Sequence, residues 1–267
     1  MKSFMVAFMA AGLLLSSNVY AGDHKKDSTH GAKKHEAAAK VNHCIGSGPQ
    51  SPRDIDMTAG TNGTTFSVAS PEGKNLCNVH FHRNAEHKAK AYSKYVESGI
   101  NSGWACSEPT ATDADRHSSH KGCGNVAPGD TIEVHWVYTS CDINAPGAIP
   151  NGPGLSACST TTCANPQLRV VAEVFVLQES GGLAFTEAAP VAFEGSSVTY
   201  IGSTTGRKYS NDNCSPYQVT WDVKETCGGL NIGSINAWCD DNKYGENHAH
   251  DVRDLVTPEN LLSTIGK

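Results

Sequence analysis

The sequence predicts a mainly β fold with minor helix. Short runs rich in Val, Phe, Tyr and Trp alternate with turn-rich stretches, and these residue types favour strands. The 267 residues include 26 glycines and 12 prolines, which favour many turns. Residues 43–267 show no linker and no repeat, and about 225 residues are enough to bury one substantial core. We therefore expect one folded domain over residues 43–267.

Each predicted element follows from local composition. Segments bounded by turn residues predict five strands, at Asn75–Arg83, Thr131–Thr139, Leu168–Gln178, Ser197–Ile201 and Tyr217–Val223. Ala85–Ser98 is rich in Ala, Lys and Glu, which predicts a short helix. Asn144–Gly154 and Ser203–Asn213 have the Gly, Pro and Ser content of loops.

The totals exclude several classes of protein. The formal net charge is −6, and a weakly acidic chain lacks the basic surface that a nucleic-acid-binding protein needs. Ten cysteines are an even number and are unusual in a reduced cytosolic protein. The composition therefore argues against a nucleic-acid-binding protein, a coiled coil and an ordinary cytosolic enzyme.

The first 42 residues are predicted to lie outside the fold. Residues 1–21 resemble a signal peptide, with Lys2, an apolar run too short to span a membrane, and a small-residue cleavage site ending at Ala21. Residues 22–42 are polar and lysine-rich and predict a disordered tether, although Gly22-Asp23-His24 also leaves a copper or nickel site open. We expect an exported protein, periplasmic or extracellular, with no membrane span.

Three histidines carry the metal-binding chemistry. His80 and His82 lie in one predicted strand and point to the same face, about 7 Å apart along it. His135 lies in a second predicted strand, so three imidazoles can converge if the strands are neighbours. Three imidazoles with a fourth position open to water are typical of catalytic zinc. Cys77 is three residues from His80 and is expected on the other face, outside the site.

The neighbours of these histidines strengthen this interpretation. His-x-His alone is a weak pattern, because histidines in strands are also common as packing or surface residues. A histidine ligand usually donates its second N–H to an acceptor. Asn78 and Glu133 stand two residues from His80 and His135, each on the same face as its histidine, and could fix the two tautomers.

The order of the motifs resembles that of the carbonic anhydrases, most closely the δ class and also the similar α class. His80–His87 (HFHRNAEH) has the compact δ-like spacing. The other matching segments are Gly48–Asp56, Asn62–Val68, Glu133–Val137, Leu168–Leu177, Thr199–Thr205 and Val219–Trp221. The resemblance implies an α-carbonic-anhydrase-like domain around a central, mostly antiparallel β-sheet.

The resemblance also implies a function. Zn²⁺ on His80, His82 and His135 would catalyse the reversible hydration of carbon dioxide to bicarbonate and a proton through zinc-bound hydroxide. The expected partners are therefore these small molecules, and Glu133 would support the third ligand from behind. The sequence leaves the oligomeric state open.

Further residues receive roles from the same resemblance. Glu86 would accept a hydrogen bond from a threonine hydroxyl that orients the hydroxide, with Thr204 favoured and Thr205 left open because the loop is one residue shorter than in the α class. The carbon dioxide pocket would be lined by Val137, Val171, Val219 and Trp221, for which ordinary core packing is the alternative. Thr64 occupies the position of the usual proton-relay histidine. The candidates for a proton relay, by residue type alone, are His87, His117 and His120.

The cysteines suggest disulfides around the zinc strands. The resemblance implies a Cys44–Cys214 bridge. The other eight cysteines allow about 105 pairings, of which Cys158–Cys163 and Cys227–Cys239 are plausible local ones. The segment from Cys106 to Cys163 is interpreted as an insertion held by disulfides. The alternative for these cysteines, a second and closed zinc site, lacks Cys-x2-Cys spacing.

Two other functions remain open. One is a non-catalytic carbonic-anhydrase-like module that binds zinc and a partner, although such a module is expected to lose a ligand. The other is zinc esterase activity at the same site. The sequence shows neither a His-Glu-x-x-His motif nor an evident Ser-His-Asp arrangement, which argues against a protease.

Overall fold

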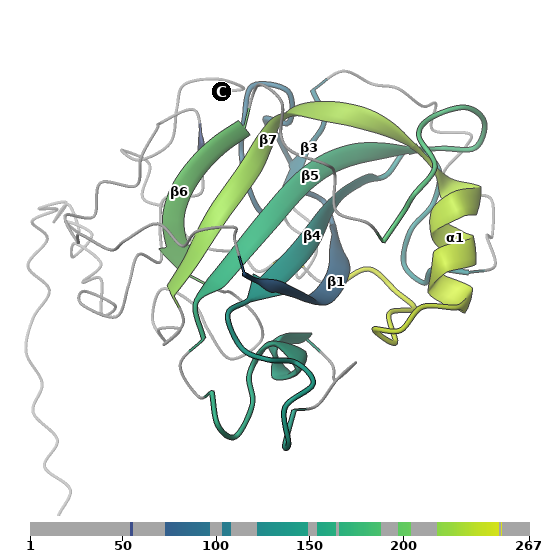
Figure 1. The fold of residues 1–267 in the computed structure, drawn as a ribbon. Helices are drawn as coiled ribbons and strands as arrows, with labels where there is room; N and C mark the ends of the chain where they lie inside the picture. The colour runs from purple at the N-terminus through teal and green to yellow at the C-terminus, as the bar shows by residue number, and fades with distance from the viewer. Residues whose placement is uncertain are drawn as a thin grey trace, which may run out of the picture. The chain divides into compact units, whose positions relative to one another are not determined.

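A five-stranded sheet in the order β1-β4-β5-β7-β6 forms the centre of the fold (Figure 1). Its strands are β1 (Asn75–Arg83), β4 (Thr131–Thr139), β5 (Leu168–Gln178), β6 (Ser197–Ser203) and β7 (Gln218–Asn231). Three of the strand pairs are antiparallel and β5 pairs with β7 in parallel. The prediction of a mainly β fold with a mostly antiparallel sheet is confirmed, and the sheet is mixed.

Smaller elements complete the structure. They are the two-stranded sheet of β2 (Lys94–Val96) and β3 (Gly103–Ala105), the 3-10 helix η4 (Gly154–Cys158) and the helix α1 (Ile232–Asp240). The computed structural model describes residues 54–55, 73–96, 103–107, 122–148, 154–163, 166–187, 197–203, 218–250 and 252. All belong to the unit Val41–Lys267.

Several predictions lie outside the described residues. These are the signal peptide and tether of residues 1–42, the Cys44–Cys214 bridge, Thr64, Thr204, Thr205, His117 and His120. Among the residues that are described, no helix is both long and apolar enough to cross a membrane.

The sheet is buried on both faces. One face packs a cluster around Val137, Val170 and Trp221. The other packs Phe81 and Trp136 against the apolar side of α1, including Ile235 and Trp238. Because side chains alternate along a strand, the nine residues of β4 supply both clusters, and its histidine belongs to the first face.

The predicted helix over Ala85–Ser98 is wrong. Ala85 exchanges backbone hydrogen bonds of 2.8 and 2.9 Å with Trp104, and Ala89 and Tyr92 bond to each other. The segment ends in β2. Its amides therefore bond to distant or turn partners, which overrides the helical preference of Ala, Lys and Glu.

The helix α1 was not predicted. Its N-cap is Asn231, whose side chain accepts a hydrogen bond from the Ser234 amide at 3.0 Å. An asparagine directly before an apolar segment is a helix-start signal. The signal was hidden because β7 continues to Asn231, well beyond its predicted end at Val223.

The disulfides correct the local pairings. The structure joins Cys77–Cys158, Cys106–Cys227, Cys123–Cys239 and Cys141–Cys163, so the bridges expected at Cys158–Cys163 and Cys227–Cys239 are wrong. No described cysteine is free, which removes the alternative of a cysteine zinc site among them. Three of the four bridges join segments more than 80 residues apart: Cys77 of β1 to η4, Cys227 of β7 to Cys106 after β3, and Cys239 of α1 to Cys123.

Candidate metal centre

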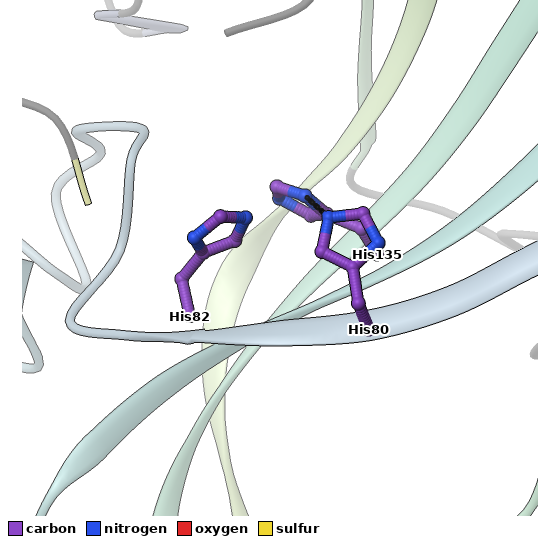
Figure 2. A group of neighbouring side chains, drawn as sticks. All are labelled: His80, His82 and His135. Atoms are coloured by element: carbon purple, nitrogen blue, oxygen red, sulfur yellow. Dashed lines mark hydrogen bonds between the residues drawn. The ribbon is translucent and has the colours of Figure 1, made fainter. Parts of the chain in front are cut away.

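The register between β1 and β4 brings three histidines together. His80 and His82 share one face of β1, and His135 lies directly opposite His80 in the antiparallel pair. The ring centroids are 5.1 Å apart for His80–His82, 5.1 Å for His80–His135 and 4.8 Å for His82–His135 (Figure 2). His82 and His135 are buried and His80 is half-buried, so the group meets solvent at one side.

The spacing of the nitrogen atoms fits a tetrahedral metal. His135 Nδ1 lies 3.3 Å from His80 Nε2, and one ligand atom from each of the three histidines lies within 4.8 Å of the others. Zn–N bonds of about 2.0–2.1 Å at a tetrahedral angle separate two nitrogens by about 3.3–3.4 Å. His80 and His135 therefore already have the separation that zinc requires.

Both predicted supporting residues contact their histidines. Asn78 Oδ1 lies 2.5 Å from His80 Nδ1, which leaves Nε2 for the metal. Glu133 Oε2 lies 3.2 Å from His135 Nε2, close enough for a charge contact although not aligned as a hydrogen bond, and this leaves Nδ1 for the metal. The two free nitrogens are the pair that face each other.

Glu133 is the centre of a buried network. Its other oxygen, Oε1, contacts His87 Nδ1 at 2.6 Å, and the Glu86 amide donates to Oε2 at 2.7 Å. His87 Nε2 meets the Tyr200 hydroxyl at 2.6 Å. Burial by itself would raise the pKa of Glu133, but the electrostatic and hydrogen-bonding contributions of His87 and His135 outweigh it and hold that pKa well below its usual value. The carboxylate is therefore charged and tied to both histidines at neutral pH.

The environment keeps two of the three candidate ligands neutral. Burial lowers the pKa of His80 well below its usual value, and the neighbouring His135, His82 and His250 lower it further. Burial likewise lowers the pKa of His82 to about 4, against an opposing contribution from Glu86. A metal binds the neutral imidazole, so neither histidine has to lose a proton at neutral pH.

The low pKa of His82 predicts acid sensitivity of the metal-free protein. In the unfolded chain histidine titrates near 6.5, so the unfolded state binds more protons than the folded state below that pH. The stabilisation is complete above about pH 6.5 and is lost as the pH falls toward 4. We expect the free energy of unfolding in urea to lose roughly 3 kcal/mol from this group between pH 7 and pH 4.

A matched pair of variants isolates this effect from the titration of carboxylates. His82→Gln should remove that part of the pH dependence, whereas replacement of the exposed His248 by Gln should leave it. Equal slopes of unfolding free energy against pH for wild type and His82→Gln would contradict the assignment.

Glu86 reaches the site through a turn after β1. Asn84 has a positive φ of 63°, a conformation that asparagine tolerates better than most residues. The turn brings Glu86 Oε1 to 4.0 Å from His82 Nε2, and the Glu86 side chain is buried. The predicted carboxylate is thus beside the ligands, while its predicted threonine partner lies outside the described residues.

The structure separates the four predicted pocket residues. Val137, Val219 and Trp221 lie in the cluster on the histidine face, and the Trp221 ring is 5.1 Å from that of His135. Val171 pairs with Trp136 and lies in the cluster on the opposite face. Val171 therefore cannot line a common pocket with the other three.

Strict alternation predicted that Cys77 faces away from His80, and this prediction is wrong. A register shift between Leu76 and Asn78 leaves Cys77 as the extra residue of a bulge, and its side chain packs in the cluster around Val137. Its bond to Cys158 removes it as a metal ligand. Cys77 is therefore outside the candidate site, as expected, but because of the disulfide and not because of its face.

His87 is buried rather than exposed to solvent. Its ring is fully enclosed, and both nitrogens contact protein atoms, on Glu133 and Tyr200. This placement makes it a support for Glu133 rather than a route to bulk water.

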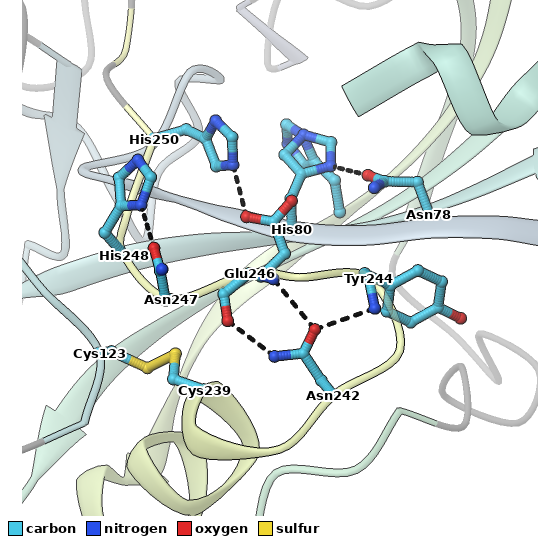
Figure 3. A network of polar contacts seen from close by, with 11 residues as sticks. Asn78, His80, Cys123, Cys239, Asn242, Tyr244, Glu246, Asn247, His248 and His250 are labelled. Atoms are coloured by element: carbon cyan, nitrogen blue, oxygen red, sulfur yellow. Dashed lines mark hydrogen bonds and ion pairs between the residues drawn. A yellow bond between two sulfur atoms is a disulfide. The ribbon is translucent and has the colours of Figure 1, made fainter. Parts of the chain in front are cut away.

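Sequence reasoning missed the segment Glu246–His250. His250 bridges to His82 in parallel, and its ring lies 5.3 Å from that of His80 (Figure 3). The available signal was a second His-x-His pattern, His248-Ala249-His250, at the far end of the chain.

The chain matches a model of a known protein family. The family model described as Delta carbonic anhydrase matches residues 72–234. This range contains the whole five-stranded sheet and all three histidines, and it ends before Glu246–His250. Searches of curated proteins and of solved structures found no match to the chain.

Proposed function

Because the chain belongs to the delta carbonic anhydrase family, we propose that it catalyses the reversible hydration of carbon dioxide to bicarbonate and a proton. The observation that carries this proposal is the group of His80, His82 and His135. Three histidines are the ligand set of catalytic zinc, whereas structural zinc is closed by a fourth protein ligand. When bound, zinc lowers the pKa of a coordinated water to about 7 and so supplies a nucleophile at neutral pH.

The surrounding residues have distinct tasks in this proposal. Asn78 and Glu133 orient two of the ligands through their second nitrogens. Glu86 would accept a hydrogen bond from the hydroxyl of Thr204, or alternatively of Thr205, and that hydroxyl would orient the nucleophile. Val137, Val219 and Trp221 offer an apolar wall beside the ligands, which suits a small apolar substrate.

We also propose that the protein works after export, in the periplasm or outside the cell. The four disulfides are consistent with an oxidising compartment. Residues 1–21 would supply the export signal.

Replacement of His82 by alanine tests the function. We expect the variant to lose stoichiometric zinc, and hydration of carbon dioxide to fall at least about 100-fold, because removing a ligand should cost at least as much as the 10–100-fold reported for changes to outer-shell partners. Metal content by elemental analysis and stopped-flow hydration with a pH indicator would be measured on the same samples.

Arg83→Ala is the matched control. Arg83 is the next residue of β1, lies on the opposite face and makes a partly exposed contact of 3.6 Å with Asp130. This variant should keep its zinc and nearly all of its activity. Hydration that survives the loss of metal in His82→Ala would refute the proposal, and an inactive wild type with full zinc would favour a non-catalytic module.

A further inference from the structure

Two further histidines, His248 and His250, lie in a segment that backbone hydrogen bonds hold beside the metal centre. The His250 amide donates to the Phe81 carbonyl at 2.8 Å, and the Arg83 amide donates to the His250 carbonyl at 3.2 Å. On the other side, the Ala249 amide donates to the Gly124 carbonyl at 3.0 Å. The segment is therefore held between β1 and Gly124 rather than free as a tail.

The turn before this segment is also fixed. Asn242 Nδ2 donates to the carbonyls of Trp238 and Glu246 at 2.9 and 2.7 Å. Its Oδ1 accepts from the amides of Tyr244 and Glu246, both at 3.0 Å (Figure 3). One side chain thus sets the path of the chain into Glu246, whose own side chain is buried.

His248 and His250 have the spacing of a metal-binding pair. Their ring centroids are 5.4 Å apart, close to the 4.8–5.1 Å found within the triad. His248 is exposed and His250 is half-buried. An ion could therefore reach the pair from solvent without any rearrangement of the fold.

The supporting contacts of the triad are repeated in this pair. Asn247 Oδ1 lies 2.6 Å from His248 Nδ1, as Asn78 lies against His80, and leaves Nε2 free. Glu246 Oε2 lies 2.6 Å from His250 Nε2, as Glu133 lies against His135, and leaves Nδ1 free. A histidine ligand usually donates its second ring N–H to an acceptor of this kind.

We propose that His248 and His250 form a second, solvent-facing site for a divalent transition-metal ion of the zinc class. Imidazole nitrogens suit zinc, copper and nickel, and water would complete the coordination. His250 is 5.3 Å from His80, measured between ring centroids, so two bound dications would repel each other. The second ion therefore binds more weakly than the first, by at least about tenfold.

Zinc titration of the metal-free full chain tests the second site. Calorimetry and elemental analysis should show a tight step and a step at least about tenfold weaker in the wild type. His248→Gln together with His250→Gln should lose the weak step, equal to one ion per chain, and keep the tight one. His248→Gln alone should weaken that step at least about tenfold without touching β1.

Two further variants make the comparison specific. Lys243→Gln, an exposed change in the same turn, should keep both steps. His82→Ala should lose the tight step and keep the weak one, so a failure of the triad and a failure of the second site are distinguishable. Ions bound elsewhere, including at histidines of residues 22–42, are common to all variants and cancel. Equal zinc uptake by the wild type and the double variant would overturn the proposal.

Discussion

Replacement of Glu133 by glutamine is expected to weaken zinc binding about 10–100-fold and to destabilise the protein by roughly 3–5 kcal/mol. The carboxylate is fully buried and meets His87, His135 and the Glu86 amide. A neutral amide cannot accept from both imidazoles and the amide at once, because half of its polar end is a donor. The buried histidines would lose their charged partner in a medium that screens poorly.

Zinc affinity by competition with a chelator and unfolding in urea with and without zinc measure the two effects. Glu173→Gln is the matched control, since Glu173 is also buried in the sheet but pairs with the partly exposed Lys224 at 3.2 Å. We expect that control to cost less than about 1 kcal/mol and to leave zinc affinity unchanged. Unchanged zinc affinity in Glu133→Gln would show that the carboxylate does not support the metal site.

Local pattern was sufficient to predict the two strands that carry the three histidines and the strand next to them. β1, β4 and β5 have the predicted bounds, because their Val, Phe and Trp residues both favour strands and fill the two clusters. Alternation placed His80 and His82 on one face with Asn78. The pairing of β4 with β1 is long-range, and local pattern could not predict it. The sequence alone therefore predicted convergence of the three histidines only if the two strands were neighbours.

Predictions failed where distant contacts decide the outcome. Alternation within β5 fixes that Val171 and Ala172 face opposite ways, but only the register with β4 shows that Ala172 shares the face of His135. The bulge at Cys77 has no signal in residue type. His250 was missed because its neighbour His82 is far away in the sequence and is reached only by a parallel bridge.

Removal of the Cys123–Cys239 bridge is expected to lower the free energy of unfolding substantially. Because Cys106–Cys227 stays closed and already joins the two segments, the loop that Cys123–Cys239 closes contains only about 29 residues, and the chain-entropy model assigns it about 3–4 kcal/mol. The same model assigns about 3 kcal/mol to Cys141–Cys163, with a sequence separation of 22. Both are large fractions of a typical domain stability of about 5–15 kcal/mol. The double alanine variants can therefore be compared directly by urea unfolding without reductant.

The two bridges should also differ in their effect on the metal centre. Cys123 precedes Gly124, which bonds the segment containing His248, and Cys239 lies in the last turn of α1 before Asn242. Loss of this bridge loosens the segment that flanks β1 at Phe81 and Arg83, so zinc should dissociate faster from the Cys123→Ala, Cys239→Ala variant. Cys141 and Cys163 lie beyond the end of β4, away from that segment, and their removal should leave zinc release unchanged. Equal zinc release rates from the two variants would show that the segment does not brace the ligand strand, because the variants would then differ only in stability.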